Sequence, residues 1–175
     1  MINNLLKKVL LIAGSPLCLE TKRNLSMYDI IVKMNATPLN EYKDYITDRC
    51  DIWITTEYVM WKCLDSLSEK KKVAKQICYI NSKKNLSNIS SQDRYRLESF
   101  KKQCNNILRE CCIPNLNATP SIGLRAIMYL LKQFTDITIL GFTFGEGQNH
   151  FYDNIPIAKN HDFNQETIII QNFIK

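Results

Sequence analysis

Two histidines are the only imidazole groups in the chain, and both fall in the segment near its carboxyl terminus, at His150 and His161. A histidine accepts a proton near neutral pH and, when protonated, faces a phosphate, so the pair is a candidate for acid–base or phosphate chemistry. Glu166 follows His161 by five residues and is a candidate to orient or polarise its ring. The alternative is that both histidines are hydrogen-bonded structural residues. The segment offers too few ligands to predict a metal site.

Glycine is scarce, with five residues in the chain. Each lies at a predicted strand end, at a helix start or in the loop after the last predicted strand. Gly14 and Ser15 end one apolar run, and Gly141 and Phe142 end another. Glycine serves where a backbone turns sharply or approaches a ligand closely. For any single glycine, an ordinary turn is as good an explanation as contact with a ligand. Gly14 and Gly141 are candidate ligand contacts because both lie at the carboxyl ends of predicted strands.

The stretch before residues 124–134 has the residues of a helix start. Ser121 is a predicted N-cap, whose side chain satisfies a free backbone N–H. The free N–H groups and the dipole of a helix start also favour a phosphate or carboxylate. Capping alone explains Ser121, but it does not explain Gly123 inside the first turn, which costs about 1 kcal/mol relative to alanine. The alternative to plain capping is therefore an anion site at this helix start.

Short apolar runs alternate along the chain with stretches of helical periodicity. The predicted strands cover residues 9–13, 30–34, 51–56, 76–81 and 137–140. The predicted helices cover residues 57–75, 91–111, 124–134 and 167–174. This alternation predicts an α/β fold, a single Rossmann-like domain over residues 1–175 with a mostly parallel sheet and helices on both faces. Such sheets bind ligands outside the carboxyl ends of the strands, where we expect Gly14, Asn35 and Thr55.

Length and composition limit the class of protein. The chain has 175 residues, 45% of them hydrophobic and 23% charged, which is ordinary for one globular domain. No apolar run approaches the roughly 20 residues of a membrane helix, and no signal peptide is evident. The seven cysteines are odd in number and lack zinc spacing. We therefore expect a cytoplasmic protein with free thiols.

The net charge of +6 comes mainly from lysine runs. Such runs are usually solvated helix ends or loops. A basic domain for polyanions is the alternative, but the runs lack the interleaved aromatic residues that would favour a nucleic acid. A small ligand that carries phosphate suits the same charge, so we expect no nucleic-acid partner.

Taken together, these segments resemble the sialyltransferases of glycosyltransferase family 29. The chain also resembles the bacterial sialyltransferases of family 42. Family 29 has four ordered motifs, called large, small, third and very small. The matching segments are 11–15 with 29–38 for the large motif, 120–123 with 140–142 for the small, 150–152 for the third and 161–166 for the very small. Lys33 stands where the family usually has arginine, Ile122 replaces a threonine, and Gly14 falls where the animal enzymes have an asparagine.

The resemblance implies a GT-A-like variant of the Rossmann fold and inverting, metal-independent transfer of sialic acid from CMP-sialic acid to a glycan hydroxyl. It implies no cofactor beyond the nucleotide-sugar donor. His161 would be the general base on the acceptor, and His150 would lie near the donor phosphate. The catalytic candidates are thus His150, His161 and Glu166. The substrate-binding candidates are Gly14, Ser15, Asn35, Ser121, Ile122, Gly123, Gly141, Phe142 and Tyr152.

Two alternatives share the same site. A transferase for another CMP-activated sugar would keep these motifs, because they hold the nucleotide more than the sugar. A non-catalytic CMP-binding protein would keep the pocket and lose acceptor recognition. The two histidines and Glu166 favour an enzyme over such a binding protein, whereas the short chain favours the binding protein.

Overall fold

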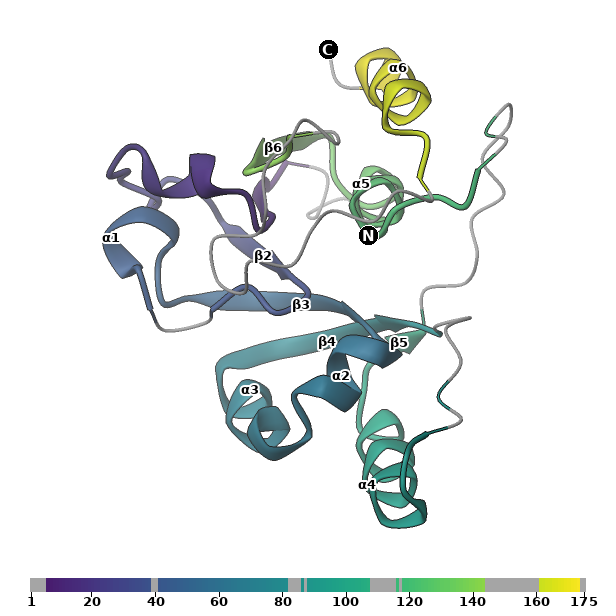
Figure 1. Ribbon diagram of the computed structural model, residues 1–175. Coiled ribbons are helices and arrows are strands. Elements are labelled where there is room, and N and C mark those ends of the chain that lie inside the picture. Colours follow the sequence, from purple (N-terminus) through teal and green to yellow (C-terminus); the bar gives the residue numbers. More distant parts are fainter. Residues whose placement is uncertain are drawn as a thin grey trace.

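A computed structural model describes residues 6–38, 41–81, 86, 88–107, 116, 118–143 and 161–173. Within them, six strands form one sheet in the order β5-β4-β3-β2-β1-β6, and every neighbouring pair is parallel (Figure 1). The strands are β1 Lys8–Ile12, β2 Ile30–Met34, β3 Cys50–Thr56, β4 Ala74–Ile80, β5 Asn106–Ile107 and β6 Asp136–Leu140. The predicted α/β, Rossmann-like fold is therefore confirmed.

Helices cover both faces of the sheet. In the view of Figure 1, α5 and α6 lie above the sheet, and α2, α3 and α4 lie below it. The α-helices are α1 Lys43–Ile46, α2 Glu57–Lys62, α3 Leu67–Val73, α4 Ser91–Lys101, α5 Ile122–Leu131 and α6 Phe163–Phe173. Two 3₁₀ turns, η2 Pro16–Leu19 and η3 Leu64–Ser66, complete the described elements. None of the helices in these residues is long and apolar enough to cross a membrane.

Alternation along the strands builds a core on each side of the sheet. Val9 and Leu11 of β1 pack with α5 and α6, whereas Leu10 and Ile12 face the opposite side with Cys18. Because side chains alternate along a strand, a strand with both faces covered is apolar throughout. That is why the short runs at β1, β2 and β3 were recognisable as strands from sequence.

The helix predicted over residues 57–75 is wrong as a single element. The chain forms α2, η3 and α3, with a break at Cys63, where φ is −110°. Ala74 then pairs with Cys50 as the first residue of β4. Pairing with β3 thus overrides the local helical pattern of this segment.

The helix predicted over residues 91–111 is too long. It ends at Lys101, and the backbone N–H of Asn105 donates to the carbonyl of Ile77 at 2.9 Å. The Asn105 side chain accepts from the Ile77 N–H at 2.9 Å in return, and the short strand β5 follows. Helix α1 and the turn η2 were not predicted, because neither has a recognisable apolar period.

Candidate functional site

The first part of the carboxyl edge joins the ends of β1 and β6. The Ala13 N–H donates to the Leu140 carbonyl at 2.8 Å, and the Ser15 N–H donates to the Gly141 carbonyl at 3.2 Å. Gly141 has a φ of +76°, and a Cβ on it would lie 2.2 Å from Cys18 Sγ. Glycine is therefore required at this position by both conformation and space. The structure thus brings Gly14–Ser15 beside Gly141–Phe142.

The start of α5 lies at the same edge. A Cβ on Gly123 would lie 2.8 Å from Cε1 of the Phe142 ring and 3.4 Å from Ser121 Oγ. Gly123 therefore allows the aromatic ring to pack against the first helical turn. This contact accounts for a glycine that helix capping left unexplained.

Ser121 caps α5, as predicted, and it also binds Glu166. Its Oγ accepts the Leu124 N–H at 3.1 Å and donates to Glu166 Oε2 at 2.5 Å. The Ser121 N–H donates to Glu166 Oε1 at 2.6 Å. Glu166 comes from α6 and is only 1% exposed. The carboxylate that a helix start favours is thus supplied by the chain itself.

His161 lies just before α6, with its Nδ1 2.7 Å from the Thr119 carbonyl oxygen and its ring edge-on to Phe163. Because a carbonyl oxygen only accepts, this bond requires the proton on Nδ1 and leaves the lone pair of a neutral ring on Nε2. That arrangement suits a base. Glu166 was expected to orient His161 directly, but both of its oxygens accept from Ser121, and the Thr119 carbonyl contacts the ring instead.

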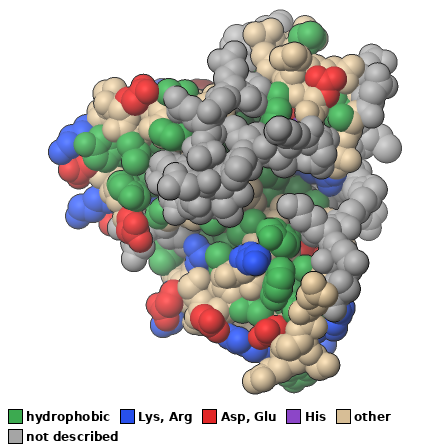
Figure 2. Space-filling model, viewed as in Figure 1, with side chains coloured by type: hydrophobic (Ala, Val, Ile, Leu, Met, Phe, Trp, Pro, Cys, Tyr) green, Lys and Arg blue, Asp and Glu red, His purple; other side chains and the backbone are tan. Residues whose placement is uncertain are grey.

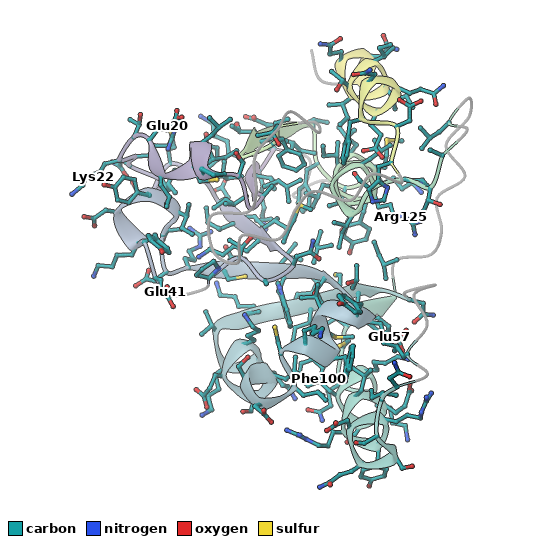
Figure 3. All side chains as sticks on the ribbon, in the orientation of Figure 1. Glu20, Lys22, Glu41, Glu57, Phe100 and Arg125 are labelled. Carbon is teal, nitrogen blue, oxygen red and sulfur yellow. The ribbon has the colours of Figure 1, made fainter. Side chains whose placement is uncertain are left out.

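Arg125 is a buried cation that the sequence analysis missed (Figure 3). It extends from α5 and is 8% exposed, and its Nε–H donates to the Pro120 carbonyl at 3.3 Å. In the sequence, Arg125 stands out as the one charged residue within the otherwise apolar run of α5. Its positive charge therefore lies near the segment that holds Ser121 and His161.

The second part of the carboxyl edge is the turn after β2. Asn35 has a φ of +49°, in the left-handed region that asparagine tolerates better than most residues. Its N–H donates to the Ile54 carbonyl at 2.8 Å, and its carbonyl accepts from Trp53 Nε1 at 2.6 Å. The Thr37 N–H closes the turn onto the Met34 carbonyl at 3.0 Å. Asn35 is therefore fixed beside the end of β3.

Three buried side-chain oxygens at this second part lack a hydrogen-bond partner among the described residues. They are Asn35 Oδ1, Thr37 Oγ1 and Thr55 Oγ1. Thr37 and Thr55 are both 0% exposed. A buried polar atom without a partner is costly, so such groups in native proteins call for a water molecule, an ion or a ligand. No sequence pattern marked the Thr37 hydroxyl.

The described residues contain no group of three or more His, Cys, Asp or Glu that could hold a metal ion. The five cysteines among them, at positions 18, 50, 63, 78 and 104, are free. On the face shown in Figure 2, acidic and basic side chains alternate along the lower and left margins. The excess of lysine therefore forms no single basic patch on the part of that face that can be described.

The structure brings most of the candidate residues to one edge of the sheet. Ser15, Ser121, Gly123, Gly141 and Phe142 form the contacts given above, and His161 and Glu166 join them through residues 119–121. Asn35 lies two strands away from β6 along the same edge. His150 and Tyr152 lie outside the described residues. No known family and no curated protein matches this chain significantly.

Proposed function

We propose that the protein is a sialyltransferase-like glycosyltransferase that moves sialic acid from CMP-sialic acid to a glycan hydroxyl, with inversion and without a metal. The observation that supports this proposal most is convergence at one sheet edge. Segments that resemble the large, small and very small motifs are far apart in sequence. They meet at this edge through the contacts of Ser15 with Gly141 and of Ser121 with Glu166.

His161 is the proposed base. The acceptor oxygen attacks the anomeric carbon while its proton passes to Nε2 of His161, the nitrogen left free by the Thr119 contact. The electron pair of the breaking glycosidic bond goes to the phosphate oxygen of the departing CMP. A sugar hydroxyl is too weak an acid to attack readily without such a base, which explains why a neutral imidazole is suited to the task.

The phosphate of CMP needs partners at the start of α5. None of the hydrogen bonds described there uses the N–H groups of Ile122 and Gly123. Ser121 donates its N–H to Glu166, so these two N–H groups are the proposed phosphate donors. Protonated His150 would add charge to the same phosphate.

Calorimetry with CMP, CTP, UMP and GMP tests the nucleotide part of the proposal. We expect CMP to bind best. Turnover of CMP-sialic acid, in EDTA and in magnesium, then tests the transfer, and we expect equal rates in both. Binding of CMP without turnover of any CMP-sugar would favour the non-catalytic CMP-binding protein. No preference for CMP would contradict the proposal, and an absolute requirement for magnesium would contradict its metal-independent mechanism.

A further inference from the structure

Lys33 is a lysine buried in the middle of the sheet. It lies on β2, in register with Trp53 of β3, and its exposed fraction is 0%. Its ammonium group donates to the Pro38 carbonyl at 3.1 Å and to the Thr47 carbonyl at 2.6 Å. Lysine is almost never fully buried unless its charge is satisfied, so this position calls for an explanation.

The two carbonyl groups belong to two different loops at the carboxyl and amino sides of neighbouring strands. Pro38 ends the turn that begins at Asn35, and Thr47 ends α1 shortly before β3. One ammonium group therefore ties the turn that carries Asn35 to the segment that leads into the next strand. The same turn is also held by the Trp53 Nε1–H, which donates to the Asn35 carbonyl at 2.6 Å.

We propose that Lys33 is a positioning residue for the nucleotide: its charged ammonium group holds the turn at residues 35–38, and thereby fixes the Asn35 side chain at the carboxyl edge. This inference rests on the proposed function only in naming the nucleotide. An ammonium group has three N–H donors, and a neutral amine has two. Loss of the proton also removes the positive charge that strengthens the hydrogen bonds to the Pro38 and Thr47 carbonyl groups, so the neutral amine holds the two segments more weakly.

The surroundings of Lys33 make this proton easy to lose. Burial lowers the pKa of Lys33 from 10.5 to about 8, and the positive charge of Lys70 from α3 acts in the same direction. Asp48 and Cys50 act in the opposite direction. Burial raises the pKa of Cys50 to about 11, so its thiol is neutral at pH 8 and supplies no counter-charge there.

The indole N–H of Trp53 reports on the turn without any ligand. In ¹⁵N-labelled protein, we expect its resonance to titrate between pH 6.5 and 9.5 with a midpoint near 8. The Lys33→Arg variant keeps its charge throughout that range and is expected to show no such midpoint. Trp61, on α2, is the internal control, because the ring contacts described for it are with Tyr58 and Lys62 of the same helix. If the Trp53 resonance of the wild type stays constant between pH 6.5 and 9.5, the inference that charged Lys33 holds the turn is wrong.

The affinity for CMP tests the second half of the inference. If only protein with a protonated Lys33 holds Asn35 in place, the apparent Kd for CMP is the intrinsic Kd divided by the protonated fraction. With a pKa of about 8, the apparent Kd is therefore about tenfold higher at pH 9 than the intrinsic value. The Lys33→Arg variant is expected to bind CMP with an affinity that does not change between pH 7 and 9. A titrating Trp53 with a constant CMP affinity would overturn the positioning role. Absence of CMP binding at every pH would instead contradict the proposed function and the choice of CMP as the nucleotide. In that case the titration of the Trp53 indole still decides whether Lys33 holds the turn.

Discussion

Ser121 with Glu166 and Asn35 with Thr55 occupy two parts of the same sheet edge, and they differ in how their polar atoms are satisfied. The Ser121 hydroxyl and both Glu166 oxygens have partners within the chain. Asn35 Oδ1 and Thr55 Oγ1 are buried but have none among the described residues. In the β1–β6 part the Ser121–Glu166 pair is therefore satisfied as folded, whereas the β2–β3 part would gain hydrogen bonds from a bound group.

This difference predicts two kinds of mutant. A substitution in the β1–β6 part removes contacts that already exist, so it is expected to lower the free energy of unfolding. A substitution in the β2–β3 part removes groups whose partners arrive only with the ligand, so it is expected to lower affinity. His161 Nε2 and the N–H groups of Ile122 and Gly123 are the exceptions that test this scheme, since they belong to the first part and are proposed to act on the substrate.

The largest expected effect is that of His161→Ala on transfer. A general base typically contributes about 10²–10⁴-fold in rate, and we expect a loss in that range. The affinity for CMP is expected to change little, because the base contacts the acceptor rather than the nucleotide. Steady-state kinetics with CMP-sialic acid and calorimetry with CMP measure the two quantities. Near-normal transfer in a folded His161→Ala protein would remove the base assignment, and Tyr152 or Asp162 would be tested next.

Glu166→Ala is expected to have the largest effect on stability. The change leaves the partly buried Ser121 N–H and hydroxyl without the acceptors of the buried Glu166 carboxylate, at a cost of about 3 kcal/mol in the free energy of unfolding. Glu166→Gln keeps one acceptor oxygen and should lose less. Urea unfolding of both variants measures the difference. If Glu166→Ala were as stable as the wild type, the β1–β6 part would not depend on this contact.

Asn35→Ala is expected to act on binding instead. A lost buried hydrogen bond would weaken CMP affinity by about 1–3 kcal/mol, because Asn35 Oδ1 has no partner to lose in the free protein. Urea unfolding should show a smaller change in stability than Glu166→Ala does. Calorimetry of the folded variant decides the matter: an unchanged Kd would take the Asn35 side chain out of the site.

The sequence was sufficient to predict five of the six strands, because short apolar runs buried on both faces are distinctive at strands such as β1, β2 and β3. It also predicted the Ser121 cap, which depends on local chemistry. It did not predict β5, which lies in a segment predicted as helix. It also did not predict the start of β4 at Ala74 or the end of α4, because pairing with residues elsewhere in the chain decides both. The break at Cys63 was not predicted either. The sequence also did not predict that Ser121 is the partner of Glu166, because the two residues are 45 positions apart. His161 was expected instead, because it is only five positions from Glu166.

The smallest expected effect is that of Thr55→Val on stability, and its direction tests whether the buried oxygens of the β2–β3 part lack partners in the free protein. Thr55→Val replaces a hydroxyl by a methyl group of similar shape, and the Thr55 Oγ1 that it removes is buried without a described partner. We therefore expect the free energy of unfolding to rise by about 1 kcal/mol, because the desolvation cost of the hydroxyl disappears.

Thr56→Val is the matched control on the next residue. Thr56 Oγ1 accepts the Val59 N–H at 3.2 Å as the N-cap of α2, so its loss should lower the free energy of unfolding by about 1 kcal/mol. The same substitution at adjacent positions is thus expected to change stability in opposite directions. Urea unfolding at one pH measures both variants. If Thr55→Val destabilised the protein as much as Thr56→Val does, the Thr55 hydroxyl would already be satisfied in the free protein, and the contrast between the two parts of the edge would fail at this residue.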